Sequence, residues 1–429
     1  MWRRTNGRDF DNLEHKEWKS VQITHTEFDR PVTNNEYVTV LPFIDKPLIK
    51  VITGMRRTGK STIMKLLIEH LCQSGVDRQC IMMVNMESID NAPLQDVHVF
   101  QKAVREKKRS APGKIYLFID EVQEIPGWER LAASLLADGD ADIYSTGSNS
   151  RLLSGEYATL LTGRFVSFQV CPLVYAEFLA FKELEHGSPE AFNEFLLFGG
   201  MPGIHHIEYT QEFVYQYLSA VKDSIILKDI VARYKIRDVQ LMEKLLVFLA
   251  DNIGNIFSAR RVADYFKKEQ RSLGIETIYN YLAYLESAFV FNKVQRFDIK
   301  GRQLLETNEK YFVTDIGLRH SIIGFRQKDI NAYLENIVYI ELLSRGYKLM
   351  IGKAGKYEVD FIAEKNNERI YVQVCYLLAD ESTMEREYRP LKMISDNYPK
   401  FVVSMDMLPE ADMDGILRVY LPDFLLRVL

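Results

Sequence analysis

Hydrophobic positions follow two patterns along the chain, and the change falls near residue 175. Before this point, short apolar runs rich in branched residues alternate with stretches in which apolar residues recur at helical spacing. The apolar runs predict buried strands at 47–52, 80–86, 116–119, 141–150 and 164–173. Continuous apolar strands that alternate with helices are typical of a parallel sheet covered on both faces. The pattern therefore predicts a doubly wound α/β domain over residues 41–175.

After residue 175 the apolar pattern is first helical and then mixed. Residues 176–250 contain AEFLAFKEL, EAFNEFLLF and LMEKLLVFLA, which predict a helical lid and linker. Helical spacing continues at 258–270 and 275–288, with a breaker at 272–274, and two apolar strands follow around the turn Lys300-Gly301-Arg302. Two helices followed by a hairpin are typical of a winged helix, expected here at 251–320. The remaining parts are an N-terminal extension, 1–40, and a second α/β domain, 321–429.

The first predicted strand runs into a loop with the sequence VITGMRRTGKST, and a helix is predicted after it. Gly54, Gly59, Lys60 and Ser61 match G-x-x-x-x-G-K-[ST] at every fixed position. Glycines let backbone N–H groups close around phosphate, and the helix N-terminus adds positive partial charge. Lys60 is expected at the β- and γ-phosphates, and Ser61 on Mg²⁺; the alternative is a Gly-rich turn that matches by chance. The predicted nucleotide contacts are Gly54, Met55, Arg56, Arg57, Thr58, Gly59, Lys60, Ser61 and Thr62.

Carboxylates follow the third strand, at the edge of the sheet where ligands bind. In KIYLFIDEVQEI, Asp120 is placed to hold Mg²⁺ and Glu121 to orient or deprotonate the attacking water. The alternative is a solvated acidic pair at a strand end. The strand at 141–150 ends in hydroxyl and amide groups, and Thr146, Ser148 and Asn149 are candidate phosphate sensors. Capping of the next helix is the alternative role for these three residues.

Composition narrows the choice of function only slightly. The chain has 47% hydrophobic and 26% charged residues and a formal net charge of -5, so nucleic-acid binding would need a local basic patch. Its four cysteines form no C-x-x-C pair, which suits a reducing compartment. Neither a signal-peptide pattern nor eighteen uninterrupted apolar residues occur. We expect a cytoplasmic protein without a membrane partner.

Several motifs together resemble a known family. The segments GMRRTGKST, FIDEVQEIPGWERL, STGSNSRLL, LTGRF, FGGMPG, LENIVYIELLSRGY and GKYEVDFIAE are similar to prokaryotic AAA-type ATPases with a conserved C-terminal domain of unknown function. The resemblance runs from about residue 40 to residue 405. It implies an AAA+ core that uses ATP, a winged helix and a C-terminal nuclease-like fold. The N/T-K-x-D pattern of guanine readers is not evident.

The resemblance also implies assembly into a homo-oligomer, with a ring as one form. In AAA+ relatives an arginine of one subunit often completes the site of its neighbour. Arg164, in LTGRF, matches this position, and Arg151 is the second candidate. The alternative for either is a solvated or structural arginine.

A local excess of positive charge accompanies the predicted winged helix. Residues 258–302 contain nine Lys/Arg against five Asp/Glu, a local charge of +4. Such a patch favours contacts with DNA phosphates, and the second helix offers no Lys or Arg for reading bases. A protein-binding or structural role is the alternative. The candidate DNA contacts are Arg260, Arg261, Lys267, Lys300 and Arg302.

The C-terminal region resembles the PD-(D/E)xK nucleases but lacks part of their site. Glu335 and Asp360 match acidic positions, whereas Gln373-Val374-Cys375 stands where the pattern has (D/E)-x-K. Glutamine is a weak ligand for a hard cation, and cysteine cannot replace the lysine. We therefore expect a nuclease-like fold without nuclease activity, in which Glu335 and Asp360 are structural remnants.

Taken together, these patterns predict Mg²⁺-dependent ATP hydrolysis coupled to DNA binding or remodelling. One alternative is a nucleotide-dependent switch that binds a protein partner. A less favoured alternative is an ATP-regulated nuclease.

Overall fold

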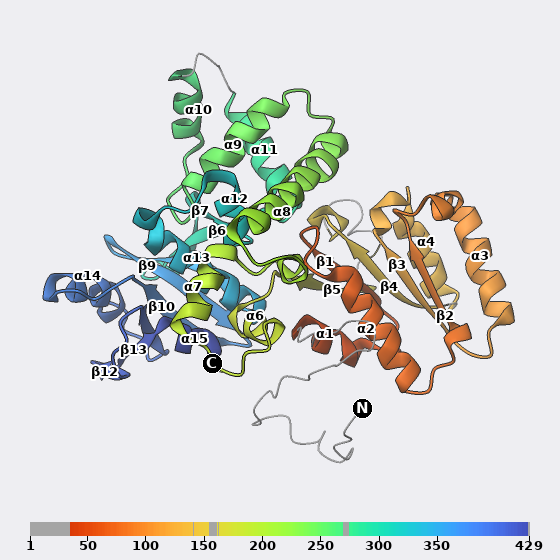
Figure 1. Cartoon of the computed structure of the whole chain (residues 1–429), viewed down its shortest axis with the longest axis horizontal. Coiled ribbons are helices and arrows are strands. Elements are labelled where there is room, and N and C mark those ends of the chain that lie inside the picture. The colour runs from red at the N-terminus through yellow and green to blue at the C-terminus, as the bar shows by residue number, and fades with distance from the viewer. Residues whose placement is uncertain (1–34, 140, 154–160, 162, 269–273, 428–429) are drawn as a thin grey trace.

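The computed structural model describes residues 35–139, 141–153, 161, 163–268 and 274–427 (Figure 1). Most of the expected N-terminal extension, and residues 272 and 273 of the expected breaker, lie outside the described residues. The described part of the extension is helix α1 (Asn35–Val40), which contacts α2 (Lys60–Gln73) and β5 (Phe165–Val170).

The N-terminal part is built on a five-stranded parallel sheet in the order β2-β3-β4-β1-β5. Strand β1 (Ile49–Gly54) pairs with the central strand β4 (Ala141–Gly147) on one side and with the edge strand β5 on the other. The register sets Ile52 opposite both Thr146 and Phe168. The remaining strands are β2 (Ile81–Asn85) and β3 (Ile115–Asp120). The predicted α/β class with a parallel sheet is confirmed.

Helices pack on both faces of this sheet, which explains why its strands are continuously apolar. Val51 joins a core with Phe100 of α3 (Val97–Ser110) and Trp128 of α4 (Trp128–Ala137). The neighbouring Ile52 points to the opposite face and packs with Leu67 of α2. All six residues of β1 are buried, and its charged side chain, Lys50, is paired with Asp142 of β4.

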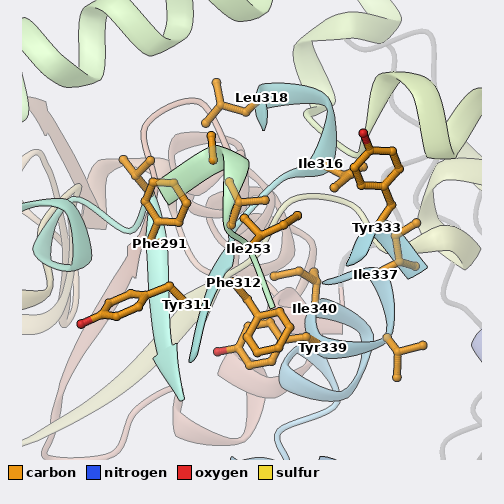
Figure 2. Packing of buried hydrophobic residues seen from close by; sticks show 14 of the residues in the cluster. Ile253, Phe291, Tyr311, Phe312, Ile316, Leu318, Tyr333, Ile337, Tyr339 and Ile340 are labelled. Atoms are coloured by element: carbon orange, nitrogen blue, oxygen red, sulfur yellow. The ribbon is translucent and has the colours of Figure 1, made fainter. Parts of the chain in front are cut away.

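A helical segment follows the sheet, as the sequence predicts. It consists of α6 (Tyr175–Phe181), α7 (Pro189–Phe198), α8 (Gln211–Ser224), a π-helix (Ile225–Ala232) and α9 (Val239–Asp251). Leu218 of α8 and Leu245 of α9 belong to the same hydrophobic cluster as Phe312 and Tyr339 farther along the chain. Figure 2 shows the centre of this cluster, where the Phe312 and Tyr339 rings stack with centroids 4.6 Å apart. The helical segment and the C-terminal part therefore share one core.

The next elements are two helices and a hairpin, in the order that the sequence predicts. They are α10 (Ala259–Lys268), α11 (Ile275–Ser287), β6 (Phe291–Asp298) and β7 (Gln303–Val313). The hairpin also pairs with a C-terminal strand, because β6 runs parallel to β8 (Lys348–Ala354). The hairpin thus continues into the C-terminal sheet across residue 320, where a domain boundary is predicted. The division of the chain into domains stays a prediction.

The C-terminal part is a mixed eight-stranded sheet in the order β12-β13-β11-β10-β9-β8-β6-β7. The remaining strands are β9 (Tyr357–Lys365), β10 (Glu368–Val374), β11 (Lys400–Ser404), β12 (Ala411–Met413) and β13 (Ile416–Tyr420). The remaining helices are α12 (Ile316–Ile323), α13 (Ile330–Ser344), α14 (Glu381–Lys392) and α15 (Leu421–Leu426). Among the described residues, no helix has both the length and the apolar character needed to cross a membrane.

Candidate functional site

The loop between β1 and α2 has a shape that only glycine permits at two positions. Gly54 has φ +151°, and a Cβ there would lie 2.4 Å from the carbonyl oxygen of Val170. Gly59 has φ +101° and precedes the first residue of α2. Positive φ at both positions excludes most side chains. The Thr58 hydroxyl donates to the Met55 carbonyl at 2.9 Å and closes the loop. The strand, loop and helix predicted around the motif are therefore present.

Lys60, at the start of α2, is buried inside this loop. Only 4% of the residue is exposed, and its Nζ donates to the carbonyls of Gly54 at 3.0 Å and Met55 at 2.9 Å. Burial lowers the pKa of Lys60, although Glu121, Asp229 and Asp120 act in the opposite direction. Carbonyl dipoles do not neutralise the ammonium, so its charge is available to an anion. Together with the N-terminus of α2, this lysine fits a nucleotide phosphate.

Ser61 and Asp120 meet at the carboxyl edge of the sheet. The Ser61 hydroxyl donates to Asp120 Oδ2 at 2.8 Å, while the Thr146 hydroxyl donates to Asp120 Oδ1. The contact forms because β1 and β3 both flank β4 and end at the same edge. A hydroxyl and a carboxylate are oxygen ligands of the kind that Mg²⁺ prefers. These two residues would hold the ion that accompanies a bound nucleotide.

Glu121 is held beside this pair in a left-handed conformation, with φ 56° and ψ 55°. The Ser148 hydroxyl lies 3.0 Å and 3.2 Å from its two carboxylate oxygens, and the Gln123 amide also donates to the carboxylate. Left-handed backbone at a non-glycine residue is strained and is more frequent at functional sites than elsewhere. Ser148 is thus in contact with the proposed base. Gln123 was not among the residues that sequence reasoning selected.

Asn149, the other sensor candidate, has a different neighbour. Its amide lies 3.3 Å from the Tyr234 hydroxyl, beyond the π-helix. Arg151 lies over the Tyr234 ring at 4.7 Å and over the Tyr284 ring of α11 at 5.6 Å. Arg151 therefore contacts aromatic rings of its own chain.

The remaining residues of the loop differ in environment. Met55 is fully buried in the hydrophobic core, Thr62 is half-buried, and Arg57 is exposed with φ 70°. Arg56 forms a salt bridge with Asp229 of the π-helix at 2.9 Å. Asp229 was missed by sequence reasoning, and its signal is an acidic residue within the apolar helical run IILKDIVA.

Arg164 lies at the amino-terminal edge of the sheet. It is exposed, and its carbonyl accepts a hydrogen bond from the N–H of Ile49, the first residue of β1. The loop that contains Gly54, Gly59, Lys60 and Ser61, called the P-loop from here on, follows the opposite end of β1. It is therefore separated from Arg164 by the length of one strand, about 20 Å at 3.3 Å per residue. Arg164 therefore lies too far away to serve the nucleotide site of its own chain.

All five candidate DNA contacts are exposed. Arg260, Arg261 and Lys267 lie on α10, while Lys300 and Arg302 belong to the turn between β6 and β7.

A second cluster of charged residues is formed by β7 and β9 of the C-terminal sheet together with helix α13. Lys310 of β7 is 4% exposed, and its ammonium lies 2.6 Å from Glu358 and 3.7 Å from Glu335. Burial alone would lower the pKa of Lys310, but Glu335, Asp360 and Glu358 outweigh it and raise the value. Burial also raises the pKa of Glu335 to about 7 and that of Asp360 above its usual range. These four residues line a cavity of about 570 Å³.

The structure changes how the missing nuclease residues are understood. Gln373 donates to Glu387 at 3.0 Å, and Cys375 is buried in a hydrophobic cluster. A lysine is nevertheless present near the acidic residues, because Lys310 enters from another strand. Among the described residues, no group of three or more His, Cys, Asp or Glu side chains is arranged to hold a metal ion.

The parallel sheet and its strand–P-loop–helix unit define a P-loop protein of the AAA class. Residues 46–179 match the model of a family described as an AAA domain, and residues 189–329 match a domain of unknown function (DUF8612). An uncharacterized protein of Haemophilus influenzae is 38% identical over 391 residues, which cover 90% of this chain and 96% of that protein. The uncharacterized protein MJ1544 of Methanocaldococcus jannaschii is 31% identical over 361 residues, which cover 80% of this chain and 77% of that protein. The chain belongs to the family of AAA-type ATPases that includes these two proteins.

Similarity to solved structures is more distant. The Aeropyrum pernix ORC1 protein in complex with DNA matches with 12% identity and a TM-score of 0.30, over 67% of this chain and 89% of that one. AMPPCP-bound DnaA from Aquifex aeolicus matches with 16% identity and a TM-score of 0.28, over 49% and 67%. The resemblance to AAA-type ATPases is confirmed by the family match, whereas the nuclease-like nature of the C-terminal part stays a prediction.

Proposed function

We propose that the protein hydrolyses ATP with Mg²⁺ at the carboxyl edge of the five-stranded sheet. The observation that carries this proposal is the joint placement of Lys60, the Ser61–Asp120 pair and Glu121 at that edge. Lys60 would bind the phosphates, Ser61 and Asp120 would hold Mg²⁺, and Glu121 would position the attacking water. Bound Mg²⁺ would supply stabilisation of negative charge on the phosphates.

We further propose that hydrolysis is coupled to DNA through a winged helix formed by α10, α11 and the β6–β7 hairpin. Exposure of Arg260, Arg261, Lys267, Lys300 and Arg302 supports this role. Contacts with phosphates provide affinity without base recognition, so we expect binding that depends on DNA structure more than on sequence. Arg164 is proposed to act on a neighbouring subunit, which requires a homo-oligomer.

A steady-state ATPase assay with single-stranded, duplex and branched DNA tests the coupling. We expect stimulation by at least one DNA form, and binding whose log-log dependence on salt has a slope of about -0.9 per neutralised phosphate on duplex. Lys300→Ala and Arg302→Ala should each flatten this slope by nearly one unit. Lys102→Ala, which removes an exposed cation of α3, is the matched control and should leave the slope unchanged. ATPase activity without salt-sensitive DNA binding would contradict the coupling.

A protein-binding switch is the second candidate, and one surface favours it. A cavity of about 1070 Å³ lies between the α6–α7 region and the C-terminal part. Leu184, Met407 and Leu408 line it and are 41%, 67% and 52% exposed. Exposed apolar side chains grouped in a hollow are typical of a protein-binding surface. Turnover that is weak and insensitive to DNA would favour this function.

A further inference from the structure

One carboxylate of the helical segment, that of Asp229, is hydrogen-bonded to Arg56 of the P-loop. Asp229 of the π-helix is 2% exposed and accepts two hydrogen bonds from Arg56, at 2.9 Å from Nε and 3.1 Å from Nη2. Arg56 also donates from Nη1 to Glu87 at 2.9 Å. Two parallel bonds from one guanidinium to one carboxylate are among the stronger polar contacts in proteins. The conformation of the P-loop is therefore tied to a residue 173 positions away.

This contact lies close enough to the phosphate-binding lysine to respond to a ligand. Arg56 follows Met55, whose carbonyl accepts a hydrogen bond from Lys60. Asp229 also acts electrostatically on Lys60, where it opposes the effect of burial on the pKa. A triphosphate bound at Lys60 would bring negative charge beside Asp229. The two anions would repel each other, and both would attract the Arg56 guanidinium.

The same segment reaches the tip of β4 and helix α11. Tyr234, just after the π-helix, stacks on Tyr284 of α11 with ring centroids 3.9 Å apart. Its hydroxyl lies 2.7 Å from the Ser287 hydroxyl and also contacts Asn149. Asn149 is the neighbour of Ser148, which contacts Glu121. Residues 225–234 thus contact the P-loop, the strand end beside the proposed base, and α11.

The backbone of this segment is unusual in a way that suits movement. Its hydrogen bonds follow the π pattern over Ile225–Ala232. Turns of π-helix are rare in proteins as a whole, and those that occur are frequently found at functional sites. Asp229 is buried in this turn together with Ile226 and Ile230, so its carboxylate has little access to water. Loss of its partner would leave a buried charge, which is costly. A change in the pairing of Arg56 would therefore favour a change in the position of the turn.

We propose that Asp229 is a positioning residue of the nucleotide site, and that Arg56 exchanges Asp229 for the phosphates of ATP. The exchange releases the Ile225–Tyr234 segment and so transmits nucleotide binding to α11. This inference rests on the proposed ATP binding. It makes Asp229 an internal competitor of ATP, so removing its charge strengthens nucleotide binding.

Titration calorimetry with ATP and a non-hydrolysable analogue, on the full chain, tests the competition. We expect Asp229→Asn to bind roughly 5- to 100-fold more tightly than the wild type, the range typical of coupled sites. Asp142→Asn is the matched control, because it also neutralises a buried aspartate that is paired with a cation, here Lys50. The control should leave ATP affinity unchanged. Equal or weaker binding by Asp229→Asn would show that its pair with Arg56 is only structural.

Hydrogen exchange on the wild-type chain tests the release without any variant. Addition of ATP should speed exchange of the amides of Ile225–Tyr234, and Lys60→Ala should not show this effect. If ATP binds but exchange in this segment stays the same or slows, the inference is overturned. If the wild type binds no ATP at all, the proposed ATPase function itself fails, so the two failures are distinguishable.

Discussion

Lys60 and Lys310 are both buried lysines beside carboxylates, yet their pKa values move in opposite directions. The pKa of Lys60 is lowered, because burial outweighs the carboxylates near it and its hydrogen bonds go to backbone carbonyls. The pKa of Lys310 is raised, because three carboxylates outweigh its burial. The identity of the partners, more than the depth of burial, sets the electrostatic character of each cluster.

This difference predicts different ligands for the two clusters. At the P-loop, the lysine charge is not cancelled by a direct ion pair, so the site favours an anion such as a triphosphate. In the second cluster, Lys310 is surrounded by Glu335, Glu358 and Asp360, which stabilise its charge within the cluster. The lysine there is already paired with carboxylates, so its charge is not available to a phosphodiester. We therefore propose that the first cluster is catalytic and that the second is structural, without nuclease activity.

The largest expected effect comes from removing the first lysine. Lys60→Ala should weaken ATP binding by about 100-fold or more, because charge-assisted hydrogen bonds to the phosphates are lost, and it should abolish turnover. Calorimetry measures the affinity, and circular dichroism checks that the fold is kept. Lys65→Ala, an exposed position on the same helix, is the control. Unchanged affinity in Lys60→Ala would refute the assignment of the P-loop.

The next prediction tests whether the nucleotide site needs Arg164 from a neighbouring subunit. Arg164→Ala should bind ATP normally but lose about 10³- to 10⁵-fold in turnover, the range for an arginine that stabilises phosphoryl transfer from a neighbour. Mixing it with Lys60→Ala subunits should restore activity, because the Lys60→Ala subunit supplies Arg164 to an intact P-loop. No recovery in mixtures shown to contain both subunits would count against a role across the interface.

A smaller loss of activity is expected at the proposed base. Glu121→Gln keeps the shape and the contact with Ser148 but removes the charge, so turnover should fall by about 10²- to 10⁴-fold with ATP affinity retained. Single-turnover kinetics measures the step. Glu124→Gln, a nearby acidic residue that is not in the site, should hydrolyse ATP at the normal rate. Normal turnover in Glu121→Gln would assign this role to another residue.

How much of this arrangement could be predicted from sequence depends on the separation of the parts. The strands, the P-loop and Asp120-Glu121 can be predicted from local patterns. Hydrophobic periodicity and motif spacing are properties of short stretches of neighbouring residues. The Arg56–Asp229 pair joins residues 173 positions apart, and Lys310 meets Glu358 from a different strand. Asp229 stands out locally as an acidic residue in an apolar run, but no local pattern shows which residue either Asp229 or Lys310 pairs with. The same holds for the pairing of β6 with β8, which depends on how two distant segments assemble.

The second lysine should affect stability and spare catalysis. Lys310→Met leaves buried Asp360 and the partly buried Glu335 and Glu358 without their cation, so it should cost about 3 to 5 kcal/mol of unfolding free energy. Urea unfolding measures the loss, and the folded variant should keep its ATP affinity. Lys348→Met, an exposed position on β8, should change stability by less than about 0.5 kcal/mol. A stable Lys310→Met variant would mean that the second cluster is not held together by its lysine.

The smallest effect concerns Glu335 and tests the charge balance of the second cluster through pH. The folded-state pKa of Glu335 is raised to about 7, from an ordinary value near 4.5, so the folded chain holds this proton more tightly than the unfolded chain. The contribution of protonated Glu335 to stability is therefore present below pH 4.5 and is lost as pH rises through 7.

Glu335→Gln tests this, because the glutamine stays neutral at every pH. In the wild type, the Oε2 atom of Glu335 has no hydrogen-bond partner among the described residues. As pH rises from 4.5 to 7, the free energy of unfolding of the variant should increase by about 1 to 3 kcal/mol relative to that of the wild type. Above pH 7 the difference should stay constant. Urea midpoints measured across this range supply the test. If the difference between the two proteins does not change with pH, the pKa of Glu335 is the same in the folded and the unfolded chain, and the contrast between the two clusters is weaker than the burial of their carboxylates implies.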